Sequence, residues 1–173
     1  SLEVPIPVMQ RGLEIAKRNN VPTILNPAPA VTLPDEVYGL CDYFTPNETE
    51  ASFLAGIPVE TTEQASEAAQ IFIERGVKTA VITLGENGVY VQNSEISQQV
   101  PAFNMGDKVL ETTGAGDAFN GGFAYALAEG MELTEAVSYG SATAAISVTR
   151  LGTAPAMPYK TEIQELLDSE KNQ

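Results

Sequence analysis

The feature that most constrains the fold is a glycine-rich stretch that leads into a helix, Thr112-Thr-Gly-Ala-Gly-Asp117. Small and apolar residues follow it, so the pattern predicts a loop that opens into a helix over 115–129. The N-terminus of a helix offers unpaired N–H groups and the positive end of the helix dipole. Gly114 and Gly116 let a ligand approach the backbone closely, because no Cβ stands in the way. The stretch therefore predicts an anion site.

Asp117 lies in the first turn of this predicted helix, where its carboxylate would repel a bound phosphate. Two interpretations are open. The carboxylate removes a proton from a hydroxyl that attacks the phosphate, or it only complements the helix dipole. The stretch is not a Walker A loop, because no Gly-Lys-Ser/Thr follows it. It also lacks the glycine spacing of the dinucleotide fingerprint, which disfavours a Rossmann oxidoreductase.

Charge and composition exclude several classes of function. The 173 residues are enough for one domain, and 9 basic against 23 acidic residues give a net charge of −14. This charge disfavours nucleic acid and anionic membrane as partners. The single cysteine, Cys41, excludes an internal disulfide, and neither a secretory signal nor a long apolar run is present, so we expect a cytoplasmic protein. Histidine is absent, which leaves carboxylates as proton carriers.

Short apolar segments alternate with helical patterns along the chain, which predicts an α/β protein with a parallel-rich sheet and helices on both faces. Strands are expected over 21–26, 43–45, 79–84, 89–91 and 96–103, with the tail of another over 2–4. Helices are expected over 5–18, 34–40, 47–56, 61–75, 115–129, 134–148 and 160–167, with fraying over 169–173. Gly121 and Gly122 are tolerable in their helix if the small-residue helix over 134–148 packs closely there.

Three further motifs, and Glu3, each have a structural interpretation. Asn47 and Glu50 have the spacing of a capping box, which explains their pattern fully. Asn87-Gly88 on its own signals a hairpin turn. The prolines of Asn26-Pro-Ala-Pro-Ala30 exclude regular helix or central strand and predict a rigid loop after a strand, where open α/β sheets place ligands. Glu3 by itself is a solvated acid at the start of a helix.

Five motifs together resemble the ribokinase-like (PfkB) carbohydrate kinase family, in the family's order and near its spacings. They are Asn26–Ala30, Thr45–Glu50, Ile82–Gly88, Glu111–Ala124 and Val148–Gly152, and the resemblance covers about residues 2–167. The first two are especially similar to those of ribokinases. Family members are close to twice this length, and the chain starts without Met. We therefore expect residues 1–173 to be the C-terminal nucleotide-binding and catalytic part of a ribokinase-like domain, lacking the N-terminal half with the lid and most sugar contacts.

The resemblance implies transfer of the γ-phosphoryl group of ATP to a primary hydroxyl of a sugar, with Mg²⁺ and a monovalent cation (K⁺). Ribose, giving ribose 5-phosphate, is the first choice, and another sugar or a nucleoside is the alternative. The sugar and ATP are the expected partners, and the full-length protein is a candidate homodimer. A second hypothesis is a nucleotide-binding fragment without catalysis, since the lid is missing. We expect the 173-residue chain alone to be inactive.

The resemblance also implies roles for individual residues. Asp117 would be the base and touch the sugar, and Glu3 would contact sugar hydroxyls. The N–H groups of Gly114, Ala115 and Gly116 would stabilise charge on the transferring phosphoryl group.

Other positions are carried over to the nucleotide and the metal ions. The nucleotide candidates are Asn47, Thr83, Gly85, Glu86, Asn87, Gly88, Gly116 and Ser141. Glu50 would orient water around Mg²⁺. The monovalent cation would lie near Glu111, Thr113, Ser147, Arg150, Gly152 and Ala156. Glu111 stands where the family usually has Asp and Ala156 where Ser is frequent, so we expect weaker activation by K⁺.

Overall fold

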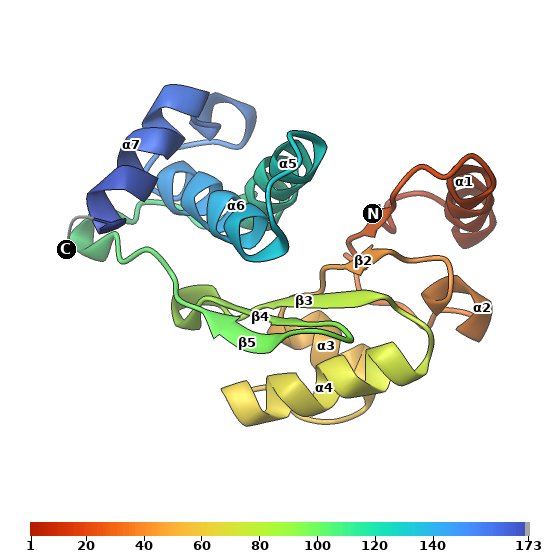
Figure 1. Ribbon diagram of the computed structural model, residues 1–173. Helices are drawn as coiled ribbons and strands as arrows, with labels where there is room; N and C mark the ends of the chain where they lie inside the picture. Colours follow the sequence, from red (N-terminus) through yellow and green to blue (C-terminus); the bar gives the residue numbers. More distant parts are fainter. Residues whose placement is uncertain (172–173) are drawn as a thin grey trace. The chain divides into compact units, whose positions relative to one another are not determined.

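The computed structural model describes residues 1–171 and contains a five-stranded sheet with helices (Figure 1). The helices are α1 (Ile6–Arg18), α2 (Asp35–Tyr38), α3 (Glu48–Ala55), α4 (Thr62–Glu74), α5 (Ala115–Ala128), α6 (Leu133–Ser147) and α7 (Lys160–Lys171). The strands are β1 (Ile24–Leu25), β2 (Tyr43–Phe44), β3 (Thr79–Thr83), β4 (Val89–Gln92) and β5 (Ser97–Val100). Single 3₁₀ turns are η1 (Gly85–Asn87), η2 (Gly106–Lys108) and η3 (Ala154–Ala156).

The strands follow the order β1-β2-β3-β4-β5 across the sheet. The pairs β1–β2 and β2–β3 are parallel, with Ile24 opposite Tyr43 and Phe44 opposite Ala80. The connections from β3 to β4 and from β4 to β5 are only a few residues long. A parallel crossover needs about a dozen residues or more, so these two pairs run antiparallel. The predicted α/β class with parallel strands is confirmed.

The chain forms two compact units. The first unit comprises residues 1–84 and 90–99, and the second comprises 85–89 and the residues from Val100 onward. In the first unit α3 and α4 pack on β3 (Figure 1). Its core contains an aromatic cluster in which the rings of Phe44 and Phe72 meet edge to face with centroids 5.0 Å apart, and Tyr38 joins at 5.6 Å from Phe44.

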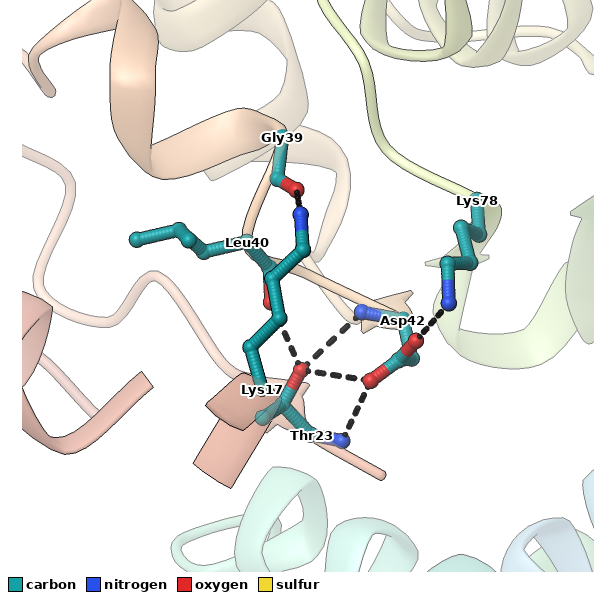
Figure 2. Close-up of polar contacts among 6 residues, drawn as sticks. All are labelled: Lys17, Thr23, Gly39, Leu40, Asp42 and Lys78. Carbon is teal, nitrogen blue, oxygen red and sulfur yellow. Dashed lines mark hydrogen bonds and ion pairs between the residues drawn. The ribbon is translucent and has the colours of Figure 1, made fainter. Parts of the chain in front are cut away.

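A polar network joins the amino ends of the three parallel strands of the first unit (Figure 2). Thr23, just before β1, donates its N–H to the carboxylate of Asp42, just before β2, at 2.9 Å. Lys78, just before β3, pairs with the same carboxylate at 2.5 Å. Burial opposes ionisation of Asp42, but the bonds from Lys78 and Thr23 outweigh it and hold its pKa below the ordinary value. The carboxylate of Asp42 is therefore paired with the ammonium group of Lys78 and hydrogen-bonded to Thr23.

The second unit contains a close contact between α5 and α6. A Cβ on Gly122 would lie 2.3 Å from the hydroxyl of Thr143 and 3.1 Å from the Cα of Gly140. Apart from the backbone of its own helix and its chain neighbours, no described atom lies within 4 Å of the corresponding point at Gly121, which is exposed. The predicted packing of the small-residue helix is confirmed for Gly122 and is wrong for Gly121, which faces outward.

Several predicted boundaries are wrong for local reasons. Residues 2–4 form no strand, and only the N–H of Leu2 binds the neighbouring loop, at the carbonyl of Ala28 (2.9 Å). β5 ends at Val100, because Pro101 cannot donate a ladder bond. α7 continues to Lys171, so residues 169–171 are helical rather than frayed, and the rest of the fraying prediction lies outside the described residues.

Cys41 is buried in the core of the first unit, where its thiol donates to the carbonyl of Val37 at 3.3 Å. Burial raises the pKa of this thiol to about 12, with a smaller contribution from the neighbouring Asp42 carboxylate. Separately, none of the helices in residues 1–171 combines the length and the apolar character needed to cross a membrane.

Candidate functional site

The N-terminus of α5 is formed by a glycine in the left-handed conformation. Gly114 is the N-cap residue with φ 82°, and among the described residues no side chain donates or accepts a capping bond there. Glycine is needed at this position because an L-residue is strained at such a φ. The N–H groups of Gly116 and Asp117 lie in the first turn, where helix geometry provides no partner. This end of α5 can therefore accept an anion.

Asp117 occupies the first turn of α5 and its side chain is exposed. Gly116 is also exposed, and apart from its own helix backbone and its chain neighbours no described atom lies within 4 Å of the point where its Cβ would stand. The second unit thus places the predicted base, Asp117, beside the predicted anion-binding N–H groups of Gly114, Ala115 and Gly116. Of these, the N–H of Ala115 already donates to the carbonyl of Thr112 at 3.1 Å. A carboxylate next to an anion site has the arrangement required for general-base chemistry on a phosphoryl acceptor.

Ser141, a predicted nucleotide residue on α6, has a hydroxyl that is buried without a hydrogen-bond partner in the described part of the chain. Buried polar groups are normally paired, and an exception calls for an explanation. A ligand atom that reaches Ser141 would satisfy the hydroxyl.

Most of the predicted cation residues take part in hydrogen bonds or an ion pair within the second unit. The carboxylate of Glu111 accepts the N–H of Gly152 at 3.0 Å. The carbonyl of Ser147 accepts the N–H of Arg150 at 3.1 Å, and the guanidinium of Arg150 pairs with Glu162. Thr113 is exposed and Ala156 is buried. The sequence did not predict the bond between Glu111 and Gly152, because these residues are far apart along the chain.

The predicted nucleotide turn, Gly85–Gly88, adopts a 3₁₀ turn in which both end glycines have positive φ, 52° and 88°. The N–H of Gly88 donates to the carbonyl of Gly85 at 3.2 Å. A Cβ on Gly88 would lie 2.1 Å from the carbonyl oxygen of Val100, so the backbone there needs glycine. Glu86 and Asn87, at the exposed tip, are thereby held in a fixed turn.

In the first unit, Asn47 and Thr83 lie together at the carboxyl ends of β2 and β3. An isolated parallel bridge joins these two residues, and the N–H of Thr83 donates to the carbonyl of Pro46 at 3.0 Å. The carboxyl edge of parallel strands is where open α/β sheets bind ligands. Two of the predicted nucleotide residues therefore share this edge.

Asn47 and Glu50 form a complete capping box at the start of α3. The side chain of Asn47 accepts the N–H of Glu50 at 2.9 Å, and the carboxylate of Glu50 accepts the N–H and the side-chain amide of Asn47 at 2.9 and 3.1 Å. Glu50 is buried, and burial raises its pKa above the ordinary value, against the effect of the Asn47 N–H. The structural interpretation of this pair is therefore satisfied in full, and each carboxylate oxygen keeps capacity for a further bond, for example to water.

The loop that follows β1 is a further candidate whose side chains the sequence analysis did not assign. Asn26 accepts the N–H of Ala28 at 3.0 Å and lies with its amide 3.5 Å from the carbonyl of Thr45 at the end of β2. Because Leu2 binds Ala28, the exposed Glu3 is held next to this loop. The strand-end position of Asn26 was the signal that could have identified it.

A family comparison identifies the chain. Residues 1–160 match the model of the pfkB family carbohydrate kinases. The chain belongs to this family. Haemophilus influenzae ribokinase is 43% identical over 167 residues, which are 96% of this chain and 54% of that protein. Salmonella typhi deoxyribokinase is 35% identical over 96% of this chain and 54% of its own length.

Solved structures agree with this family assignment. The structure of Arabidopsis thaliana ribokinase complexed with ribose and ATP superposes with a TM-score of 0.90 at 34% identity, over 95% of this chain and 53% of that one. Thermotoga maritima ribokinase gives 0.80 at 42% identity, over 91% and 52%. The predicted ribokinase-like fold is confirmed. The chain spans about half the length of the relatives that it matches.

Proposed function

We propose that this chain supplies the nucleotide-binding and phosphoryl-transfer part of a sugar kinase that moves the γ-phosphoryl group of ATP to the primary hydroxyl of ribose. The observation that carries the proposal is the N-terminus of α5, where N–H groups without side-chain caps and the carboxylate of Asp117 share one turn. In this role the N–H groups of Gly114, Ala115 and Gly116 stabilise charge on the phosphoryl group, and Asp117 accepts the proton of the attacking hydroxyl.

Ribose is preferred because the relatives at 43% and 38% identity are ribokinases, whereas deoxyribokinases match at 35%. The two sugars differ at one hydroxyl. A site that hydrogen-bonds this hydroxyl rejects the analogue that lacks it by a large factor. A kcat/KM comparison of ribose, 2-deoxyribose and fructose therefore decides the substrate, and a preference for either of the other two sugars would contradict our choice.

The chain fits Mg²⁺ that arrives with the nucleotide rather than a resident metal. No group of three or more His, Cys, Asp or Glu side chains able to hold a metal occurs within residues 1–171. Mg²⁺ commonly binds substrate phosphates, keeps several waters and takes one or two carboxylates. The free capacity of the Glu50 oxygens suits such a water-mediated contact. When bound, the ion would neutralise charge on the phosphates.

The predicted monovalent-cation site has part of its donor set already in use. The carboxylate of Glu111 and the carbonyl of Ser147 each accept a backbone N–H. We therefore propose that K⁺ activates the enzyme less than it activates a relative with Asp at this position. Activity in K⁺ and in a large organic cation at equal ionic strength, with the wild type and with Glu111→Asp, tests this. Weaker activation of Glu111→Asp would contradict it.

The test of the main proposal uses the complete gene product that contains these residues. Asp117→Asn should lower ribose-dependent ADP formation by about 10²–10⁴-fold, which is the usual loss on removal of a general base. ATP binding, measured by calorimetry, should persist. Asp107→Asn is the matched control, because Asp107 is an exposed acid on η2 outside α5. Near-wild-type turnover of Asp117→Asn would remove Asp117 from the mechanism.

The alternative is a nucleotide-binding module without catalysis. Calorimetric titration of the 173-residue chain with ATP, followed by an assay with ATP and ribose, separates the two hypotheses. We expect binding without sugar-dependent turnover, because the chain would lack groups that hold the acceptor hydroxyl in line. Turnover by the 173-residue chain would contradict this expectation. An inactive complete gene product would favour the alternative.

A further inference from the structure

The loop that precedes α5 is tied to the segment that follows α6, and both lie in the second unit. The carbonyl of Val148 accepts two N–H groups from this loop, those of Leu110 at 2.8 Å and Glu111 at 3.2 Å. In the opposite direction, the carboxylate of Glu111 accepts the N–H of Gly152 at 3.0 Å. The loop and the segment therefore exchange hydrogen bonds both ways, through backbone and side chain.

A packing contact adds to these bonds at the residue that begins α5. The methyl group of Thr153 faces Gly114, and a Cβ on Gly114 would lie 3.2 Å from it. Gly114 has positive φ and, among the described residues, no side chain caps the helix there. Since glycine is the most permissive residue, its conformation depends on what surrounds it. Thr153 is placed to limit that freedom.

The segment after α6 is itself anchored. The guanidinium of Arg150 forms an ion pair with Glu162 of α7, and this partner lowers the pKa of the Glu162 carboxyl. The N–H of Arg150 donates to the carbonyl of Ser147 at 3.1 Å, and the hydroxyl of Thr149 donates to the carbonyl of Ile146 at 2.7 Å. Residues 148–150 are thus fixed to α6 and α7, and Gly152 and Thr153 follow directly after this anchored part.

We propose that Glu111 and Thr153 are positioning residues that hold the loop over 112–114, and with it the phosphoryl-binding N–H groups, in the conformation needed for transfer. This inference rests on the proposed function. Neither side chain has to touch the substrate. Donors that are fixed before the reaction stabilise developing charge without reorganisation, and a misplacement of about 1 Å can cost on the order of 10²-fold in rate.

Each of the two residues has a pair of variants, one that keeps the proposed contact and one that removes it. Glu111→Gln keeps an oxygen that can accept the N–H of Gly152, whereas Glu111→Ala removes it. Thr153→Val keeps the methyl group that faces Gly114, whereas Thr153→Ser removes it. Glu165→Ala, on the exposed surface of α7, controls for the loss of a carboxylate in general.

Steady-state kinetics of the complete gene product test the proposal. Glu111→Ala and Thr153→Ser should lower kcat by roughly 10–100-fold with little change in KM for ATP, because positioning acts on the transition state. Glu111→Gln and Thr153→Val should recover most of the loss. If Glu111→Ala keeps the wild-type kcat, or if Glu111→Gln is as slow as Glu111→Ala, the positioning role of the hydrogen bond is overturned. Equal kcat values for Thr153→Ser and wild type overturn the role of Thr153.

Hydrogen exchange provides a readout that does not need activity. In the wild type the amide of Gly152 should be protected by Glu111. The amide of Ala115 donates to the carbonyl of Thr112 at 3.1 Å, and it should exchange faster in Glu111→Ala than in Glu111→Gln. Unchanged exchange at these amides in Glu111→Ala would overturn the positioning proposal itself. A wild-type enzyme without sugar-dependent turnover would instead overturn the proposed function, and with it the kinetic role of the two residues.

Discussion

The helices α3 and α5 begin in opposite ways. At α3 the side chain of Asn47 accepts the N–H of Glu50, and the carboxylate of Glu50 accepts the N–H of Asn47, so the capping box is complete. At α5 the N-cap is Gly114, and among the described residues no side chain closes the end. The first arrangement stabilises the helix with residues from the chain, and the second leaves donors available to an anion. The comparison shows that stability and binding make different demands on the same backbone feature.

The comparison depends most on Gly114, so replacing it should have the largest effect. Gly114→Ala forces an L-residue into positive φ, which costs about 1–2 kcal/mol, and places a methyl group against Thr153. We expect a loss of roughly 10²-fold in kcat, because the phosphoryl-binding N–H groups shift. Gly130→Ala is the control, since Gly130 has φ 78° and open space around it at the other end of α5. Equal kcat losses for the two variants would contradict the special role of Gly114.

The second prediction concerns the packing of Gly122 against α6, and the neighbouring Gly121 provides its control. Gly122→Ala should lower the free energy of unfolding by about 1–3 kcal/mol, because its methyl group would overlap Thr143 of α6. Gly121→Ala should raise it by up to about 1 kcal/mol, because alanine favours the helix and the site is open. Urea unfolding measures both. Equal effects would mean that the α5–α6 packing differs from the one described.

The capping box at the N-terminus of α3 predicts that loss of its cap lowers the free energy of unfolding. Asn47→Ala removes the side chain that caps the helix and should cost about 0.5–2 kcal/mol in urea unfolding. Asn47→Ser keeps a side-chain acceptor for the cap without adding a negative charge beside Glu50, and it is the matched control. If Asn47→Ala lost ATP affinity without losing stability, α3 would resemble α5 in its role, and the distinction between the two helices would fail.

The smallest predicted effect concerns the pH dependence that Glu50 adds. Burial raises the folded-state pKa of its carboxyl above the ordinary 4.5. A raised carboxyl pKa means that the folded state binds the proton more tightly, so the stabilisation is present at low pH and is lost as pH rises from 4.5 through the folded pKa. The stability of the wild type relative to Glu50→Gln should therefore fall over this window. A rise in urea titrations at several pH values would contradict the burial of the carboxylate.

Local sequence signals predicted much of the fold. The capping spacing at Asn47 placed the start of α3, and this box is complete in the structure. The helix predicted from residue 61 likewise begins at a complete box, formed by Thr61 and Gln64. The strand over 21–26 was predicted too long, because Val21 and Pro22 are exposed and only Ile24 and Leu25 pair with β2. Pairing depends on the neighbouring strand, which a single run of sequence does not contain.

The candidate site was predictable where one motif contains the whole feature, as at Gly114–Asp117. Individual contacts between segments that are distant in the sequence could not be predicted in this way. The family resemblance assigned Glu111 and Gly152 to one cation site, but it did not predict the hydrogen bond between them. It assigned Ser141 to the nucleotide, but it did not predict that the hydroxyl is buried without a partner in the described part of the chain. These features arise from tertiary packing, which positions residues without a local pattern.

The buried state of Cys41 makes the protein convenient for spectroscopy. A thiol with a pKa of about 12 contains almost no thiolate at neutral pH, and the side chain is also shielded from reagents. A maleimide fluorophore would therefore leave the 173-residue chain unlabelled. One cysteine introduced at an exposed position, such as Gln98 on β5, would then carry the dye alone, and fluorescence could follow ligand binding without removal of Cys41.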